Sequence, residues 1–250
     1  MKHLLLTNDD GITARGLKSL QRCFKNHDYK ISIVAPLLEM SAVSHGITTN
    51  RPIRMQQMHT DNQNGVFVGI EGTPADCVKM ALQYLLKKDL PDMVISGINQ
   101  GANTGFNILY SGTVAAAYEG LFEGIPSLAV SCSSFYWKDY DPFYPVIRKV
   151  TEWWVKEKNV DYLLNLNFPP TDKIEGIKIV KQGLTRFKEK LKEQEDPRGR
   201  TFFWLDGELI VDNDENTEDV NLCRNYATLC PLTYDLTYHK AIDDLKRIWE

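Results

Sequence analysis

Residues 3–11 read HLLLTNDDG, a short apolar run that ends abruptly in polar residues and a glycine. The same order, a short apolar run and then a helical pattern, recurs along the first two-thirds of the chain. One helical face is visible at Leu17, Leu20 and Phe24. Short apolar strands separated by helices are typical of a parallel sheet covered on both faces. The sequence therefore predicts an α/β fold with a mostly parallel sheet covered by helices.

The elements expected in this core can be given by residue range. Strands are predicted at 3–6, 30–35, 93–95, 127–131 and 162–166, and helices at 75–86, 114–122 and 142–157. In the last helix we expect Trp153 and Trp154 to face inward. Residues 48–55 and 65–70 look like an inserted β-hairpin whose strands are joined by a polar loop.

The composition changes after Pro169-Pro170. Residues 181–200 hold seven basic and four acidic side chains, which favours a solvated loop or hairpin, with a mobile arm near an anionic substrate as the alternative. A second hairpin is predicted from strands at 201–205 and 208–211 that turn at Asp206-Gly207. A short helix, a β-prone segment at 228–236 and a final helix at 241–249 follow. We therefore divide the chain into a catalytic core, 1–180, and a hairpin with a C-terminal arm, 181–250, within one domain overall.

The composition excludes several classes of protein. The 250 residues carry 29 basic and 33 acidic side chains, a net charge of −4, and no broad basic surface that would bind a nucleic-acid duplex. No apolar run approaches the ~18 residues of a membrane span. The five cysteines are scattered and form no CxxC pair, which disfavours a zinc site or a disulfide framework. We expect a cytoplasmic protein with no membrane partner.

Two polar segments that follow predicted strands carry candidate metal ligands. Asn8-Asp9-Asp10-Gly11 places two carboxylates where ligands of a parallel sheet bind, and a divalent cation would offset their repulsion. Taken alone, this motif is more often a turn. Residues 96–105, SGINQGANTG, add the amide oxygens of Asn99 and Asn103, which suit Mg²⁺. This segment matches neither a Walker loop nor GxGxxG, and its alternative reading is a long polar loop.

Two further segments supply candidates for substrate contact. Ser111, Gly112 and Thr113 precede an Ala-rich helix, whose N-terminal N–H groups favour a phosphate. An ordinary helix cap is the alternative. In residues 39–46, EMSAVSHG, Ser41 offers a hydroxyl oxygen and His45 an acid or base, although a lone serine or histidine is usually a loop residue.

These segments follow neighbouring strands, so they should meet at one edge of the sheet. Their candidate ligands, Asp9, Asp10, Ser41 and Asn99, all bind through oxygen, which suits one Mg²⁺ or Mn²⁺ and disfavours zinc. A cation beside a helix N-terminus suggests a phosphoester substrate attacked by water. Candidates for contacting the phosphate or the rest of the substrate are Asn8, Asn103, Ser111, Gly112 and Thr113.

At these motifs the chain resembles the SurE family, the stationary-phase survival protein E nucleotidases. The motifs that carry the resemblance are residues 5–11, 72–78, 94–103, 110–117, 165–169, 196–199 with Trp204-Leu205, and 231–237. They occur in order over nearly the whole chain. One segment departs from the family pattern, which usually has arginine and glycine around the serine, where this chain has Met40 and Ala42.

The resemblance implies a metal-dependent 5′- and 3′-nucleotidase of the cytoplasm with a Rossmann-like core. It also implies Asp9, Asp10, Ser41 and Asn99 as metal ligands, and a C-terminal arm exchanged between subunits of a homodimer or homotetramer. The expected reaction converts nucleoside 5′- and 3′-monophosphates to nucleoside and phosphate. Two alternatives use the same site: a phosphatase for other phosphomonoesters or short-chain polyphosphate, and a non-catalytic nucleotide-binding stress protein. The base preferred, the physiological metal and the number of subunits stay open.

Overall fold

A computed structural model describes residues 1–25, 27–58 and 65–250 of the chain. Its strands are β1 (Lys2–Thr7), β2 (Tyr29–Pro36), β3 (Met55–Gln57), β4 (Phe67–Ile70), β5 (Met93–Gln100), β6 (Ser127–Cys132), β7 (Leu163–Phe168), β8 (Ile177–Ile179), β9 (Arg186–Glu195), β10 (Thr201–Ile210) and β11 (Ala227–Leu232). Its α-helices are α1 (Arg15–Phe24), α2 (Pro74–Met80), α3 (Asn107–Tyr110), α4 (Gly112–Phe122), α5 (Tyr144–Glu157), α6 (Glu218–Cys223) and α7 (Ile242–Trp249). A π-helical segment η1 (Ala81–Leu85) continues α2, and 3₁₀ turns η2 (Asp141–Phe143) and η3 (His239–Ala241) precede α5 and α7.

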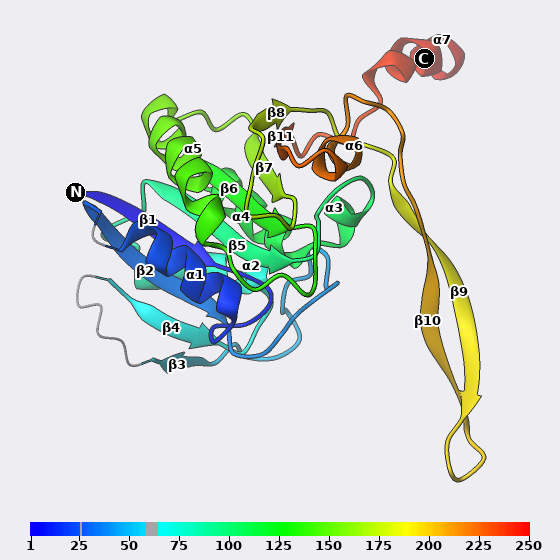
Figure 1. Cartoon of the computed structure of the whole chain (residues 1–250), viewed down its shortest axis with the longest axis horizontal. Coiled ribbons are helices and arrows are strands. Elements are labelled where there is room, and N and C mark those ends of the chain that lie inside the picture. The colour runs from blue at the N-terminus through cyan, green and yellow to red at the C-terminus, as the bar shows by residue number, and fades with distance from the viewer. Residues whose placement is uncertain (26, 59–64) are drawn as a thin grey trace.

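Within the described residues, nine strands form one sheet in the order β3-β4-β2-β1-β5-β6-β7-β11-β8. Pairing is parallel from β4 through β7, and antiparallel between β3 and β4 and between β7 and β11. Helices α1 and α5 cover one face, and α2 and α4 cover the other (Figure 1). The expected α/β fold, a mostly parallel sheet covered by helices, is confirmed.

The buried strands bring their last residues to one edge of the sheet. Leu4, Leu5 and Leu6 of β1 are fully buried and divide between the apolar clusters on the two faces, as the alternation of side chains along a strand requires. Because β1 lies between β2 and β5, the segments that follow these strands are neighbours. That edge holds most of the candidate site residues.

Three local predictions were wrong. Residues 96–100 continue β5 and are not loop. Asp206-Gly207 lies in the middle of β10, where Gly207 pairs with Glu189. The turn of this β-ribbon lies instead at residues 196–200, where Gly199 donates to the Asp196 carbonyl. In α5, Trp154 is fully buried but Trp153 is 44% exposed, because consecutive side chains on a helix point about 100° apart.

The last third of the chain divides between the sheet and two protruding elements. Strand β11, which the sequence placed in the arm, pairs with β7 and β8 inside the sheet, and α6 packs beside it. The β9–β10 ribbon extends away from the sheet, and α7 lies apart from it (Figure 1). The predicted hairpin at 48–70 is only partly present, as the short β3–β4 pair. Its polar loop falls at residues 59–64, outside the described residues. No helix in the described part of the chain has the length and apolarity needed to cross a membrane.

Candidate functional site

Asp9 follows β1 and is held by the start of α4. The Thr113 hydroxyl donates to one carboxylate oxygen of Asp9 at 2.6 Å, and the Thr113 N–H donates to the other at 3.2 Å. Asp9 is almost fully buried, and this burial raises the pKa of its carboxyl above the ordinary value despite both hydrogen bonds. The N-terminus of α4 therefore already binds an anionic group, which is a side chain of the protein itself.

The other two residues of the predicted phosphate-binding turn have local contacts. Ser111 is the N-cap of α4, and its hydroxyl accepts the Val114 N–H at 3.0 Å. Gly112 lies against Asp9, so that a Cβ at this position would come within 3.0 Å of the Asp9 Cβ and of Pro74 Cγ. A side chain at Gly112 would therefore press first on a candidate metal ligand.

Asp10 lies between β1 and the end of β5. Its Oδ2 accepts the Gln100 N–H at 3.4 Å. Burial, together with the nearby charges of Asp9 and Glu39, raises the pKa of Asp10 to about 7. The negative charges of Asp9 and Glu39 thus raise the proton affinity of Asp10, which is the situation that a bound cation relieves.

The end of β5 brings two asparagines to the site in different roles. Asn99 donates from Nδ2 to the Gly101 carbonyl, which leaves its Oδ1 as the atom able to bind a ligand. Asn103 is engaged by the protein: its N–H donates to Asn167, its Nδ2 donates to Ser131, and its carbonyl accepts from Asn165. Asn103 ties this loop to the ends of β6 and β7.

The segment that follows β2 lies against Asp9 through its backbone. The Met40 N–H donates to the Asp9 carbonyl at 2.7 Å, whereas Ser41 is exposed and donates to Glu39 Oε1 at 2.8 Å. Ala42 has a φ of +56°, a left-handed conformation that favours glycine. The family usually has glycine at this position. This chain therefore has alanine where its backbone conformation favours the family's glycine.

The donors at this edge suit a hard divalent cation. Asp9 and Asp10 supply carboxylates, and Asn99 supplies an amide oxygen. Asn8 is buried beside them, and its Oδ1 has no hydrogen-bond partner in the described structure. Among the described residues no three His, Cys, Asp or Glu side chains are grouped to hold a metal. A cation bound at this edge would therefore need neutral oxygen ligands in addition to the carboxylates.

The structure thus joins Asp9 to Thr113, joins Asp10 to Gln100, the neighbour of Asn99, and leaves Ser41 facing Glu39. Two residues that contribute to the site are not predicted from the sequence. Glu39 lies in a segment that follows a predicted strand. Its position in the sequence, however, is equally typical of an ordinary carboxylate exposed to solvent. Gln100 acts through its backbone N–H, which residue type does not reveal.

Comparisons with known proteins identify relatives of this chain. A family model described as "Survival protein SurE" matches residues 4–189. A protein of Synechococcus elongatus named "5'-nucleotidase SurE" is 39% identical over 98% of this chain and 98% of its own. Its namesake in Syntrophobacter fumaroxidans is 41% identical over 97% of each chain. The crystal structure of the SurE protein from Aquifex aeolicus superposes with a TM-score of 0.85 at 34% identity, covering 99% of this chain and 100% of that one.

Proposed function

Because the chain belongs to the SurE family of survival proteins, we propose that it is a nucleotidase that hydrolyses nucleoside 5′-monophosphates to nucleoside and phosphate. The observation that carries this proposal is that relatives named as 5′-nucleotidases match along nearly the full length of both chains. The fold supports the proposal, since oxygen-bearing side chains and a helix N-terminus meet at the carboxyl edge of the parallel sheet. Hydrolysis of 3′-monophosphates belongs to the same proposal.

A divalent cation, Mg²⁺ or Mn²⁺, would be held by Asp9, Asp10 and Asn99, with Ser41 as a further candidate. Bound there, it would offset negative charge on the phosphoryl oxygens and make water a better nucleophile. The chain's own groups orient this set. Thr113 fixes both oxygens of Asp9, and the Gln100 N–H fixes one oxygen of Asp10. The remaining N–H groups of the α4 N-terminus favour an anion nearby.

We further propose that the protein is a homo-oligomer whose C-terminal arm packs on a second copy. Two apolar surfaces support this. The β9–β10 ribbon exposes Leu191, Trp204 and Leu205, and a two-stranded ribbon is only marginally stable alone. Helix α7 has no buried residue, although Leu245, Ile248 and Trp249 give it an apolar stripe. Free thiols at all five cysteines support placing the protein in the reducing cytoplasm.

Release of phosphate from 5′-AMP, with and without EDTA, tests the proposed function. We expect turnover with Mg²⁺ or Mn²⁺ that EDTA abolishes. A panel with 3′-AMP, glycerol phosphate and short-chain polyphosphate separates a nucleotidase from a broader phosphatase. A wild-type protein that binds AMP and releases no phosphate with either metal would instead be a nucleotide-binding protein.

Asp10→Asn provides the matched variant. It keeps the shape of the side chain but removes one anionic ligand. We therefore expect the fold to persist and kcat to fall by ~10- to 100-fold. Circular dichroism checks the fold, and phosphate release at saturating Mn²⁺ checks kcat. Normal turnover at saturating metal would contradict the assignment of Asp10.

A further inference from the structure

The loop that follows β5, residues 101–106, sets the orientation of Asn99. Asn99 donates from Nδ2 to the Gly101 carbonyl at 2.9 Å, and this bond leaves Oδ1 as the atom free to bind a ligand. Asn103 fixes the middle of the loop, because its carbonyl accepts hydrogen bonds from two asparagines of β7. The position of this loop therefore decides where the amide of a candidate cation ligand points.

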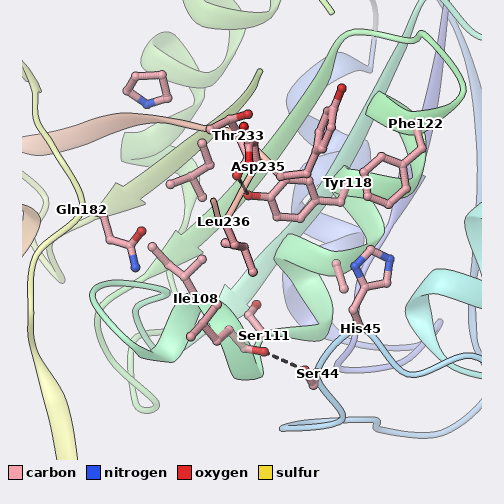
Figure 2. Close-up of a pocket in the computed structure, with 15 residues that line it drawn as sticks. Ser44, His45, Ile108, Ser111, Tyr118, Phe122, Gln182, Thr233, Asp235 and Leu236 are labelled. Carbon is pink, nitrogen blue, oxygen red and sulfur yellow. Dashed lines mark hydrogen bonds between the residues drawn. The ribbon is translucent and has the colours of Figure 1, made fainter. Parts of the chain in front are cut away.

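The far end of the loop is held by residues much later in the chain. The Phe106 N–H donates to the Thr185 carbonyl at 2.8 Å. The Gly105 carbonyl accepts a hydrogen bond from Gln182 Nε2 at 2.9 Å. Gln182 also lines the pocket beside the N-terminus of α4, across from Tyr118 (Figure 2). Both contacts come from the segment that leads into β9, so they tie the loop to the start of the ribbon.

A third contact is a hydrogen bond to a carboxylate. Thr104 is 1% exposed, and its hydroxyl donates to Asp219 Oδ1 at 2.9 Å. Asp219 lies in the first turn of α6, and its Oδ2 is buried with no hydrogen-bond partner in the described part of the chain. A buried carboxylate oxygen without a partner destabilises the folded state. A role in stabilising the fold is therefore a poor explanation for a carboxylate at this position.

We infer that Asp219 is a positioning residue for the candidate cation site. Its carboxylate holds the Thr104 hydroxyl and so fixes the end of the loop 101–106. The Gly101 carbonyl of the same loop then fixes the Asn99 amide. The pair joins residues 115 positions apart, so α6 acts on a site to which it contributes no ligand. The inference rests on the proposed function, because the site is the one where a divalent cation would bind.

Calorimetric titration of Mn²⁺ into the whole, metal-free protein tests this inference without turnover. Thr104→Val keeps the shape of the side chain and removes the hydroxyl. We expect the Kd for Mn²⁺ to rise about 3- to 10-fold, less than the loss typical of a residue bonded directly to a metal ligand. Thr104→Ser retains the hydroxyl and should bind Mn²⁺ like the wild type.

Thr217→Val is the matched control for this titration. Thr217 is a buried threonine at the N-cap of α6, and its hydroxyl donates to the Asp214 carbonyl and not to the loop. We expect the variant to unfold at lower urea concentration than the wild type and to bind Mn²⁺ with unchanged affinity.

Three results of the titration would overturn the inference. One is an unchanged Mn²⁺ affinity in Thr104→Val, and another is an equal loss of affinity in the two valine variants. The third is a Thr104→Ser variant as weak as Thr104→Val, because packing of the methyl group would then explain the effect.

A double-mutant cycle tests whether Thr104 acts through Asp219. Asp219→Ala removes the acceptor, so it should weaken Mn²⁺ binding as much as Thr104→Val does. Adding Thr104→Val to Asp219→Ala should weaken binding no further. Additive losses would overturn the inference, because the two residues would then act independently, and so would wild-type affinity in Asp219→Ala.

Hydrogen exchange of the metal-free protein reports on the loop itself and separates this inference from the proposed function. We expect the Phe106 amide to exchange faster in Thr104→Val than in the wild type and to be unchanged in Thr217→Val. If AMP is not hydrolysed but Mn²⁺ affinity and exchange change as expected, the inference stands and the proposed function fails. If AMP is hydrolysed and Thr104→Val changes neither quantity, the inference fails and the proposed function stands.

Discussion

At the scale of single residues, Thr113 has the most specific role in the site, because its hydroxyl and N–H hold both oxygens of a buried carboxylate. Thr113→Val keeps the shape and removes the hydroxyl. We expect the free energy of unfolding to fall by about 1.5–3 kcal/mol, the range for a hydrogen bond to a charged group. We also expect kcat/KM for AMP to fall about 10- to 100-fold as Asp9 loses its orientation. Urea unfolding and phosphate release measure the two effects.

Thr113→Ser is the matched control for this prediction. It retains the hydroxyl and should keep most of the activity and stability. A serine variant as impaired as the valine variant would assign the effect to packing of the lost methyl group, and an unimpaired valine variant would contradict the proposed role of the hydroxyl.

The burial of Glu218 leads to a prediction about how stability depends on pH. Glu218 is fully buried at the start of α6, where its Oε2 accepts the Gly183 N–H at 2.7 Å, and burial raises its pKa from 4.5 to about 7. The unfolded chain loses this proton near pH 4.5 and the folded chain near pH 7. The contribution to stability is therefore fully present below pH 4.5 and is lost as the pH rises to 7.

Glu218→Gln removes this titration. We expect the difference in unfolding free energy, variant minus wild type, to grow by roughly 3 kcal/mol between pH 4.5 and 8. Urea unfolding at a series of pH values measures it. Curves that stay parallel for the two proteins across this interval would show that the Glu218 pKa is not raised in the folded state.

Which site residues are predictable from sequence depends on what their roles require. Asp9, Asp10 and Asn99 could be proposed because each lies at or next to the carboxyl end of a recognisable strand. The contacts of Thr113 could not, because they join residues 104 positions apart. Ser111 was proposed both as a phosphate contact and as a helix cap, and the structure gives it the cap.

At the scale of elements, the root of the β9–β10 ribbon is locked against the loop after β5. Gly105 has a φ of +53°, and a Cβ there would lie 2.3 Å from the Thr185 carbonyl oxygen. Gly124 has a φ of +71° with nothing within 4 Å of an added Cβ. Alanine at either position bears the ~1 kcal/mol strain of the left-handed conformation. We expect Gly105→Ala to lose a further ~1–3 kcal/mol through overpacking, measured by urea unfolding.

Equal losses in Gly105→Ala and Gly124→Ala would contradict this prediction, because the two positions share the backbone strain and differ in the space around them. A larger loss of stability in Gly105→Ala than in Gly124→Ala would show that close packing at the ribbon root adds to the stability of the fold.

Elements were predictable where local pattern and tertiary context agree. Strands β1, β2, β6 and β7 have apolar runs that are buried on both faces, so the run itself specifies them. Strand β10 was misread because Asp206-Gly207 is a strong turn signal, yet ten consecutive cross-strand pairs with β9 override it. Strand β5 continues through polar residues because β6 pairs with it as far as Gln100.

At the scale of the whole molecule, the proposed exchange of the C-terminal arm can be tested by truncation. The sheet ends at Leu232, so a chain that stops after Thr237 keeps every strand and loses α7. We expect its circular dichroism to retain the α/β signature. We expect its mass by sedimentation velocity to correspond to fewer subunits than that of the full chain. A folded truncated protein that sediments as the same oligomer would exclude α7 from the interface.

The mixed end of the sheet was beyond prediction from sequence. The pairing of β11 with β7 joins segments about 60 residues apart, and the ribbon between them gives no local sign of it. The hydrophobic pattern of the sequence therefore predicts the parallel core of the sheet but not the antiparallel strand β11 beside it.

This late closing strand also affects how the protein emerges from the ribosome. About 60 residues separate the end of β7 from the end of β11, and at ~5–20 residues per second their synthesis takes roughly 3 to 12 s. Throughout that interval the backbone N–H and C=O groups along one side of β7 have no strand to pair with. Strand β8 is already made but must wait, because it pairs only with β11. On a polysome, where copies of the chain are crowded together, such an open edge is a template that β11 of a neighbouring chain can also fill.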